Sequence, residues 1–498
     1  MESSITLNHT NDEFGGSIKV IASKSHAHRL LIAGALTLLG DRNSPGINII
    51  CSETSTDIEA TAFCLSGLGI SIERTADGFL LSNSIGTAST AGTASTTGAA
   101  STAGTASTTG TASTAGTAST TGAAADNNTT ENATVTADTS SGLKTASRAQ
   151  IDAGESGSTL RFLLPVISIL GIDADITTHG RLTERPLSPL YEEMLSHGAS
   201  ISPQGSNPLS LSGRMTGGDF KIAGNISSQF ITGLLFALPM SDRTSRIIIT
   251  GGLASRPYVD ITLDVLRIAG IQINVVEDTE TSTIYEVPGN QRYRLPAECT
   301  VEGDWSNAAF FLAAGAIRNS ITMHGLNSSS KQGDRRIVEL LREFGADITE
   351  ERDGGLSRLT VSHRPLKGIE IDAEDIPDLV PILSLTAAAA EGTTVIKNIE
   401  RLRIKESDRV ATVIDTLTRL GAVIYEKDNT LVIDGKDSGN GRILAGGTVD
   451  SYNDHRIAMT AGIASIISTG PVTITNEKAV NKSYPGFFND LDSLNHPR

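Results

Sequence analysis

One block of sequence recurs six times and constrains the fold more than any other feature of the chain. Each block has a polar helix start, a helix of small apolar residues, and a glycine-centred stop followed by an alternating strand. The six helix starts begin at residues 25, 157, 227, 304, 378 and 454. Ser and Asp at these starts are read as N-cap residues, whose oxygens accept free N–H groups of the first turn. Five stops, around residues 67–69, 198, 270, 345 and 421, place Gly where a helix ends in the left-handed region. The pattern predicts an α/β (α+β) chain with mixed sheets.

The spacing of the blocks is interrupted once. Counted from residues 158, 228, 305, 378 and 454, the starts lie 70, 77, 73 and 76 residues apart, whereas 133 residues separate residue 25 from residue 158. Removing residues 86–147 leaves 71 residues there and 436 residues in the fold. Residues 86–125 are all Gly, Ala, Ser or Thr, with too little apolar surface to offset about 1–2 kcal/mol of backbone entropy per residue. We predict a disordered low-complexity insertion at 86–147 in the first repeat, rather than a hexapeptide solenoid, and expect its deletion to preserve activity.

Composition excludes several classes of protein. A formal net charge of −16 argues against a nucleic-acid-binding protein, so any anion site must be local. No run of 18 apolar residues is present, and residues 1–10 lack a signal-peptide pattern, so we expect no membrane span and a cytoplasmic protein. Three cysteines without metal-ligand spacing suggest neither a disulfide framework nor a metal site.

The helix starts are candidate anion sites, because a helix N-terminus carries partial positive charge and free N–H groups. Several starts also bring cations, among them Lys24, Arg29, Arg161 and Arg456. Any single start is more simply explained as a cap. Three starts in each half of the chain suggest two similar domains, with a cleft between them that holds more than one anionic group.

Four charged residues allow two interpretations each. Arg185 is either a solvated loop charge or an anion ligand, and Asp378 is either a helix cap or a base that accepts a hydroxyl proton. Glu406 is either a paired surface charge or a proton donor to an anionic alkene. Lys405, four residues before Arg409, is either part of a charged helix face, where this spacing is repulsive, or one of two cations with an anion between them, which explains the spacing better.

Ten ordered motifs between residues 18 and 488 give the chain a family resemblance. They are Lys24-Ser25-x-x-x-Arg29, Gly157-Ser158-Thr159-Leu160-Arg161, Glu184-Arg185-Pro186, Ser227-Ser228-Gln229-Phe230, Arg256-Pro257-Tyr258, Glu302-Gly303-Asp304, Gln332-Gly333-Asp334, Lys405-Glu406-Ser407-Asp408-Arg409, Asp454-His455-Arg456 and Asn481-Lys482-Ser483-Tyr484-Pro485. In this combination the chain resembles the 5-enolpyruvylshikimate-3-phosphate synthase family, the 3-phosphoshikimate 1-carboxyvinyltransferases.

The resemblance implies two inside-out α/β domains, each of three βαβαββ repeats. One domain would cover residues 24–298, and the other residues 1–23 plus 299–498. The implied reaction transfers the enolpyruvyl group of phosphoenolpyruvate to the 5-hydroxyl of shikimate 3-phosphate, through a tetrahedral intermediate, in chorismate and aromatic amino-acid biosynthesis. No metal and no organic cofactor is expected. The implied partners are the two substrates, with no nucleic acid or membrane, and the chain is expected to be a monomer.

The resemblance also implies roles for individual residues. Shikimate 3-phosphate would be bound by Lys24, Ser25, Arg29, Ser227, Ser228, Gln229, Ser255, Tyr258, Asp378 and Lys405. Phosphoenolpyruvate would be bound by Lys24, Gly157, Arg185, Gln229, Arg409, Arg456 and Lys482. Asp378 or Lys24 would accept the 5-hydroxyl proton, and Glu406 would protonate the methylene carbon.

Two features of the chain bear on these roles. Arg401 stands where the family often has a small polar residue, and Gly157 leaves space beside phosphoenolpyruvate, which predicts sensitivity to glyphosate. The nearest rival is the UDP-N-acetylglucosamine enolpyruvyl transferase, which usually has a reactive Cys on a loop facing the cleft, and residues 179–189 contain none. A second rival is a scaffold protein that displays the low-complexity tract, and the complete set of charged motif residues counts against it.

Overall fold

The computed structural model describes residues 3–9, 14–51, 53–83, 148–436, 439 and 441–495, which belong to one compact unit. The insertion predicted at residues 86–147 lies outside the described residues. Helices and strands alternate along the rest of the chain, as the repeated block predicts. The prediction of a mixed α/β fold is therefore confirmed.

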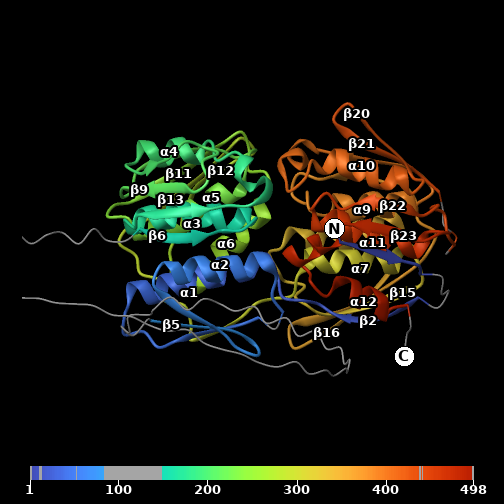
Figure 1. Cartoon of the computed structure of the whole chain (residues 1–498), viewed down its shortest axis with the longest axis horizontal. Coiled ribbons are helices and arrows are strands. Elements are labelled where there is room, and N and C mark those ends of the chain that lie inside the picture. Colours follow the sequence, from blue (N-terminus) through green and yellow to red (C-terminus); the bar gives the residue numbers. More distant parts are fainter. Residues whose placement is uncertain are drawn as a thin grey trace, which may run out of the picture. The chain divides into compact units, whose positions relative to one another are not determined.

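The described strands form six mixed sheets (Figure 1). Each sheet has one parallel strand pair, and its other pairs are antiparallel. A parallel pair needs a crossover, which a helix supplies, whereas consecutive antiparallel strands need only a turn. Where a repeat is continuous, the order is strand, helix, strand, helix, strand, strand, which is the βαβαββ unit expected.

Three sheets lie in the half of the unit at the left of Figure 1, which we call the first half. Their strands, in order across each sheet, are β14 (Glu298–Thr300), β3 (Ile47–Ile50), β5 (Gly78–Asn83) and β4 (Ile70–Arg74); β6 (Ala149–Asp152), β7 (Ala174–Thr177), β9 (Leu209–Ser212) and β8 (Ser200–Ile201); and β10 (Asp219–Ala223), β11 (Ser245–Thr250), β13 (Ser282–Val287) and β12 (Asn274–Asp278).

The other three sheets lie in the second half, at the right of Figure 1. Their strands are β16 (Asp347–Asp353), β17 (Leu356–Ser362), β15 (Ser320–Leu326) and β2 (Gly15–Lys19); β18 (Glu370–Asp372), β19 (Gly392–Lys397), β21 (Thr430–Gly435) and β20 (Val423–Lys427); and β1 (Ser4–Leu7), β23 (Val472–Thr475) and β22 (Gly447–Asp450).

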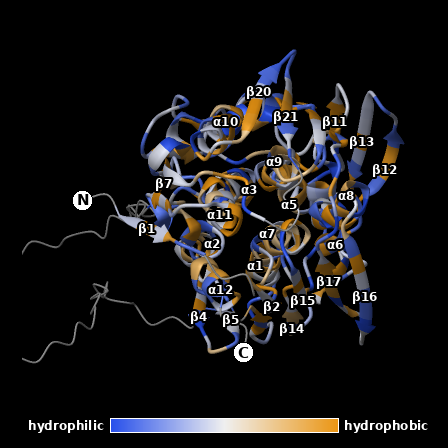
Figure 2. Cartoon of the chain, turned by 90° about the vertical axis from the view of Figure 1, so that its right-hand side faces the viewer, coloured by the Kyte–Doolittle hydropathy of each residue, from blue (hydrophilic) through white to orange (hydrophobic). Residues whose placement is uncertain are grey.

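Buried helices occupy the middle of each half, and the sheets lie outside them (Figure 2). They are α1 (Lys24–Gly40), α3 (Gly157–Leu170) and α5 (Ser228–Ala237) in the first half, and α7 (Trp305–Ile317), α9 (Val380–Ala388) and α11 (His455–Ala464) in the second. Every residue of α9 and α11 is buried. Complete burial is expected for α9, which is almost entirely apolar, whereas α11 also buries His455 and Arg456 at its start. Small residues allow this packing: a Cβ on Gly315 would lie 2.7 Å from the carbonyl oxygen of Val361.

Six further helices and six short 3-10 turns among the described residues complete the two halves. The helices are α2 (Thr56–Gly67), α4 (Leu190–Ser196), α6 (Arg256–Ile268), α8 (Ile337–Phe344), α10 (Arg409–Arg419) and α12 (Phe487–Ser493). The 3-10 turns are η1 (Gly180–Glu184), η2 (Leu238–Met240), η3 (Gly333–Arg336), η4 (Glu400–Ile404), η5 (Ser465–Ile467) and η6 (Glu477–Lys482). None of the described helices is long and apolar enough to cross a membrane.

The predicted helix starts are correct to within a few residues, but three predicted caps are wrong. Ser227, Asp304 and Asp454 accept backbone N–H groups as predicted. The helix predicted to start at residue 25 is instead capped by Ser23, two residues earlier. The helix predicted to start at residue 157 is capped by Ser156, one residue earlier. In addition, α9 begins after residue 379 without a side-chain cap, so the carboxylate at position 378 is free for another role.

Glycine ends the helices where the sequence predicts it. Gly69, Gly198, Gly270, Gly345 and Gly421 all have positive φ, between 74° and 100° except for Gly345 at 110°. This left-handed conformation is strained for residues with a Cβ, which explains why glycine recurs at each stop.

The chain crosses between the halves twice, and the two crossing segments lie side by side. Ala22 and Gly303 form an antiparallel bridge, the Ser23 N–H donates to the Glu302 carbonyl at 2.8 Å, and the Asp304 N–H donates to the Ile21 carbonyl at 2.9 Å. Strands β1 and β2 consequently belong to sheets of the second half. The domain boundaries at residues 23 and 299 stay a prediction.

Candidate functional site

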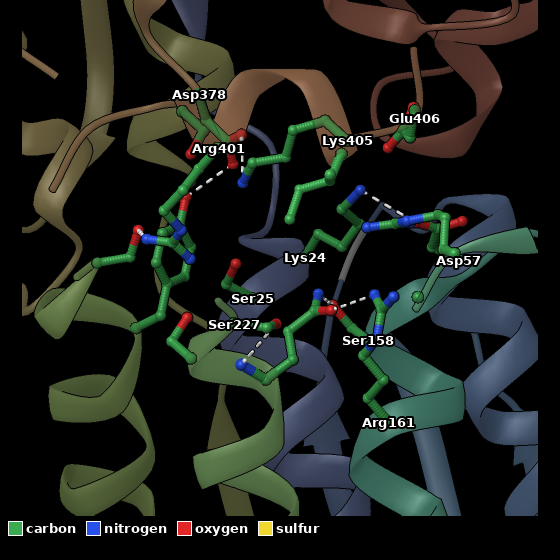
Figure 3. Close-up of a pocket in the computed structure, with 18 of the residues that line it drawn as sticks. Lys24, Ser25, Asp57, Ser158, Arg161, Ser227, Asp378, Arg401, Lys405 and Glu406 are labelled. Atoms are coloured by element: carbon green, nitrogen blue, oxygen red, sulfur yellow. Dashed lines mark hydrogen bonds and ion pairs between the residues drawn. The ribbon is translucent and has the colours of Figure 1, made fainter. Parts of the chain in front are cut away.

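A cavity opens where the starts of the six buried helices converge (Figure 3). Its wall includes Lys24 of α1, Gly157 of α3, Ser228 of α5 and His455 of α11, together with the cap Asp304 before α7. The full set of lining residues is Lys24, Ser25, Arg29, Asp57, Gly157, Ser158, Arg161, Phe162, Arg185, Pro186, Ile226, Ser227, Ser228, Gln229, Phe230, Ser255, Tyr258, Asp304, Ser306, Asp378, Arg401, Ile404, Lys405, Glu406, Arg409, His455, Arg456 and Ser483.

The cavity carries positive charge although the chain is acidic. Eight of its lining residues are Lys or Arg and four are Asp or Glu, in a chain of formal net charge −16. The positive ends of the converging helices add to this excess. The site is therefore suited to anions, as the sequence predicts for a local anion site.

Asp378 is the carboxylate around which the cations gather. Its Oδ1 accepts a hydrogen bond from Arg409 Nη1 at 2.6 Å and lies 3.5 Å from Lys405 Nζ. Its Oδ2 accepts from Arg456 Nη2 at 3.2 Å and from the Tyr258 hydroxyl at 2.7 Å. Burial raises the pKa of Asp378, but the neighbouring cations lower it by more than burial raises it. The pKa of Asp378 therefore lies well below its ordinary value. Asp378 is thus an ionised carboxylate in this site.

Lys405 and Arg409 are four residues apart, and an anion does lie between them. That anion is the carboxylate of Asp378, so the interpretation of the pair as a charged surface face is wrong. Arg409 is further held by Asp454, whose carboxylate accepts from Nε at 2.8 Å and from Nη2 at 3.3 Å. Because both side chains are almost fully buried, this pair fixes the guanidinium rigidly.

Lys24 is held in its charged form. Its Nζ lies 3.0 Å from Asp57 Oδ2, and its backbone N–H donates to Asp304 Oδ2 at 3.1 Å. Burial lowers the pKa of Lys24, but Asp57 and Glu406 raise it, and the net change is upward. Lys24 is therefore an ammonium that can donate a proton or attract an anion.

Lys405 behaves differently from Lys24. Burial lowers its pKa, Asp378 opposes that change, and the nearby guanidinium groups of Arg401 and Arg409 lower it again, to about 8. Lys405 can therefore lose its proton at moderately alkaline pH.

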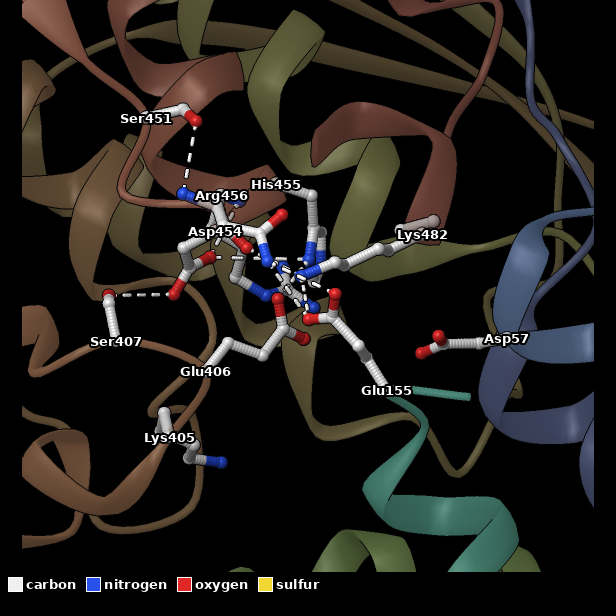
Figure 4. A network of polar contacts seen from close by, with 12 residues as sticks. Asp57, Glu155, Lys405, Glu406, Ser407, Ser451, Asp454, His455, Arg456 and Lys482 are labelled. Carbon is white, nitrogen blue, oxygen red and sulfur yellow. Dashed lines mark hydrogen bonds and ion pairs between the residues drawn. The ribbon is translucent and has the colours of Figure 1, made fainter. Parts of the chain in front are cut away.

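Glu406 pairs with His455, the buried first residue of α11 (Figure 4). His455 Nδ1 lies 2.8 Å from Glu406 Oε2, and burial lowers the pKa of His455. Burial raises the pKa of Glu406, but the hydrogen bond from His455 and the charges of Lys24 and Lys482 lower it to well below its ordinary value. Glu406 is consequently ionised when no substrate is bound.

A cluster of polar side chains from the first half of the unit lines one wall of the cavity. Gln229 connects α5 to α3, because its Oε1 accepts from Arg161 Nη1 at 2.8 Å and its Nε2 donates to Ser158 Oγ at 3.0 Å. Ser227 caps α5 by accepting from the Gln229 N–H at 3.3 Å, and Ser228 is buried beside it. These side chains form a preorganised hydrogen-bonding wall.

Arg29 lines the same wall but is already engaged by the protein. Its Nε donates to Thr262 Oγ1 at 2.8 Å, its Nη1 to the Ser25 carbonyl at 2.6 Å, and its Nη2 to the Tyr258 carbonyl at 2.7 Å. Burial lowers the pKa of Arg29 to about 9. Its main visible role is to hold α6 against α1.

The guanidinium of Arg185 has no hydrogen-bond acceptor among the described residues. Arg185 lines the cavity, and its Nε is buried. It packs against Gly157, where an added Cβ would lie 2.7 Å from Arg185 Nη1 and 2.9 Å from Arg161 Nη1. Arg185 is half-buried and lines the cavity, which argues against the interpretation as a solvated loop charge and favours the interpretation as an anion ligand.

Comparison with known proteins decides the family. A family model described as EPSP synthase (3-phosphoshikimate 1-carboxyvinyltransferase) matches residues 110–491. The chain belongs to the EPSP synthase family. A 3-phosphoshikimate 1-carboxyvinyltransferase from Clostridium kluyveri is 35% identical over 492 residues, 98% of this chain and 97% of the relative. One from Clostridium novyi is 37% identical over 487 residues, 97% of this chain and 95% of the relative.

Solved structures show the same fold. An EPSP synthase from Acinetobacter baumannii has a TM-score of 0.71 at 24% identity and covers 98% of this chain and 97% of its own. The enolpyruvyl transferase NikO from Streptomyces tendae has a TM-score of 0.64 at 16% identity, with 99% and 98% covered. These likenesses confirm the fold expected of an EPSP synthase, which alone does not determine a substrate.

The structure brings together nearly all residues that the resemblance to EPSP synthases assigns to the site. One is set apart: Lys482 does not line the main cavity. Its Nζ lies 2.7 Å from Glu155 Oε2 and donates to the Asn453 carbonyl at 2.6 Å. Figure 4 shows Lys482 and Glu155 pointing toward one another from the two halves.

Several lining residues were not among the predicted site residues. Asp57 and His455 are the most consequential, because they set the charge states of Lys24 and Glu406. In the sequence, Asp57 is an ordinary acidic residue in the first turn of a helix, which favours negative charge for its own reasons. No local signal distinguishes it. Arg161 and His455 stand within two predicted motifs, and that signal could have found them.

One group of described side chains has metal-ligand geometry. Single ligand atoms of Glu406, Asp454 and His455 lie within 4.8 Å of one another. However, Glu406 already bonds His455, and both oxygens of Asp454 already accept from Arg409. The donor set is therefore committed to charge pairing. That the enzyme needs neither metal nor organic cofactor stays a prediction.

Proposed function

We propose that this protein transfers the enolpyruvyl group of phosphoenolpyruvate to the 5-hydroxyl of shikimate 3-phosphate, releasing phosphate. Membership of the EPSP synthase family and relatives named 3-phosphoshikimate 1-carboxyvinyltransferase support the proposal. The observation that carries it is an ionised Asp378 inside a cluster of cations, next to a wall of hydrogen-bonding side chains. Such a site can bind two anionic substrates and still retain an acceptor for a hydroxyl proton.

The proton acceptor in this proposal is Asp378 rather than Lys24. Lys24 already carries its proton, since its pKa is raised, whereas Asp378 is ionised. The low pKa makes Asp378 a weak base. The 5-hydroxyl proton would thus transfer late, after protonation at C3 has made C2 of phosphoenolpyruvate electrophilic. Lys24 would stabilise the negative charge of the tetrahedral adduct.

Glu406 is the proposed acid for C3. It is ionised in the empty site because His455, Lys24 and Lys482 lie near it. A bound phosphoenolpyruvate adds negative charge beside the same cations, which raises the pKa of Glu406 and favours uptake of a proton. In the addition step, Glu406 gives its proton to C3, the 5-oxygen then bonds to C2, and the 5-hydroxyl proton passes to Asp378. In elimination, C3 returns that proton and the C2–O bond to phosphate breaks.

The remaining residues are proposed to bind and orient the substrates. Phosphoenolpyruvate would be met by the arginines, whose planar fork pairs with carboxylate and phosphate oxygens, together with Lys24, Gly157, Gln229 and Lys482. The proposed arginines are Arg185, Arg409 and Arg456. Shikimate 3-phosphate would be held by Lys24, Ser25, Arg29, Ser227, Ser228, Gln229, Ser255, Tyr258, Asp378 and Lys405.

The decisive experiment measures phosphate release by the purified protein. Phosphoenolpyruvate is supplied with shikimate 3-phosphate, and in a parallel reaction with UDP-N-acetylglucosamine. We expect release only with shikimate 3-phosphate. Release only with the UDP-sugar would favour the rival transferase, and no release with either would refute the proposed activity.

We also propose that the enzyme acts as a monomer in the cytoplasm, on small molecules alone. Size-exclusion chromatography with light scattering tests the oligomeric state. A mass near twice the 52.1 kDa of the chain would contradict a monomer.

A further inference from the structure

Arg401 is a cavity residue that the proposed reaction has not used. It belongs to the turn η4 of the second half, which lies immediately before Lys405. Its Nη1 donates to Ser255 Oγ at 2.6 Å, across to the first half of the protein. Its Nε is buried and has no acceptor among the described residues, and no described carboxylate forms an ion pair with it.

A half-buried guanidinium whose buried Nε–H has no acceptor among the described residues is suited to bind an anion. Leaving such a donor without an acceptor is unfavourable, and more so when the group is charged. Ser255 satisfies only one of the five N–H groups, and its own hydroxyl donates to the Glu374 carbonyl at 3.3 Å. The rest of the guanidinium faces the cavity.

The surroundings of Arg401 indicate which anion binds there. In Figure 3, Arg401 lies on the side of the cavity with Ser227 and Ser25, away from Arg161 and Asp57. Ser255 stands at the start of α6 with a φ of +56°, a strained conformation for a residue other than glycine, and it is 1% exposed. Its hydroxyl is therefore held in place as the contact for the guanidinium.

We propose that Arg401 binds the phosphate of shikimate 3-phosphate and sets the preference for this substrate over unphosphorylated shikimate. The inference rests on the proposed function and deepens it. The guanidinium of Arg401 contacts the hydroxyl of Ser255, and the hydroxyls of Ser227 and Ser228 line the same cavity. A guanidinium recognises a dianionic phosphate far more strongly than a neutral hydroxyl, because its N–H groups match two phosphate oxygens at once.

Nearby charge supports the same assignment. Arg401 is one of the groups that lower the pKa of Lys405, so the two cations repel each other in the empty site. A phosphate between them removes that repulsion. Burial also lowers the pKa of Arg401 itself.

The test compares Arg401→Asn with a matched control in the same turn, Arg403→Asn. Arg403 points away from the cavity, toward Glu426 at 2.6 Å and Asp408 at 3.3 Å. Three quantities are measured for each protein: kcat, KM for shikimate 3-phosphate, and Ki of shikimate as its competitor. A thermal melt checks that each variant folds.

For Arg401→Asn we expect KM for shikimate 3-phosphate to rise about 10- to 100-fold, while Ki for shikimate stays within about twofold. KM for phosphoenolpyruvate and all constants of Arg403→Asn are expected to stay unchanged. Arg401→Lys should recover part of the loss, because its ammonium keeps the charge without the fork.

Two outcomes would overturn the inference. If Arg401→Asn weakens shikimate 3-phosphate and shikimate by the same factor, Arg401 only joins the two halves through Ser255. If neither changes, the phosphate binds elsewhere. Should Arg401→Asn fail to fold, the same comparison on Arg401→Lys decides. Absence of turnover in the unaltered protein would instead refute the proposed function.

Discussion

Raising the pH above 8 should remove the charge of Lys405 and weaken binding of shikimate 3-phosphate. Burial is the main cause of its low pKa of about 8, compared with the ordinary value of 10.5. The difference corresponds to about 3 kcal/mol against the ammonium form. Lys24 stays charged over the same range, because Asp57 and Glu406 hold its pKa above the ordinary value. The two cavity lysines are therefore separable by pH.

The expected size of the effect follows from the fraction of ammonium. With a pKa of about 8, roughly nine tenths of Lys405 is charged at pH 7 and roughly one tenth at pH 9. Since kcat/KM reports the ionisation of the free enzyme, it should fall about tenfold between these pH values and about tenfold per unit beyond. The substrate phosphate has a second pKa of about 6, so its charge stays nearly constant between pH 7 and the alkaline end of the range.

The assay follows phosphate release at low shikimate 3-phosphate and saturating phosphoenolpyruvate from pH 6.5 to 10. Lys405→Arg is the control, because an exchanged guanidinium at this position keeps its charge near pH 8. We expect a fall centred near pH 8 in the unaltered enzyme that is absent from the variant, in which the fall should begin only near pH 9, where Arg29 loses its charge. A flat profile in the unaltered enzyme, or the same fall in Lys405→Arg, would refute the reasoning.

Three further substitutions test the rest of the site. Asp378→Asn should lower kcat by about 10²–10⁴-fold, because it removes the proposed proton acceptor, and a kcat within threefold would contradict that role. Gly157→Ala places a Cβ 2.7 Å from Arg185 Nη1 and should raise KM for phosphoenolpyruvate about tenfold, with a smaller change in KM for the other substrate; equal changes in both would argue for general distortion. Asp57→Asn removes the carboxylate that raises the pKa of Lys24, so in a Lys405→Arg background the alkaline fall of activity should begin at a lower pH than in Lys405→Arg alone, and superimposable pH profiles of these two proteins would contradict this.

Features that depend on neighbouring residues were predicted well. The stop at Gly345 is left-handed because residues close in sequence end the helix there, and Asp304 caps α7 by reaching a backbone group three residues away. The errors at Ser23 and Ser156 have a local cause too. Each start contains more than one serine or polar residue, and small differences in backbone conformation decide which of them becomes the cap.

The roles at Asp378 depended on residues far away in the chain. The sequence left a cap and a base open, and it could not place Tyr258 or Arg456 against the same carboxylate. Likewise, nothing near Lys405 in the sequence predicts that it is the cavity lysine with the lower pKa. Burial and the charges around it determine that property, and both arise only when the helices pack.

The sequence by itself determined the repeat, the mixed α/β fold, and a set of charged residues at helix starts, because hydrophobic periodicity and capping act over a few residues. The tertiary structure alone decided how those starts meet in one cavity, which carboxylates neutralise which cations, and which guanidinium groups stay free for a substrate. The physical reason is the sequence separation over which each interaction acts. A helix start is set by its own first turn, whereas a charge state is set by burial and by groups that the fold brings from hundreds of residues away.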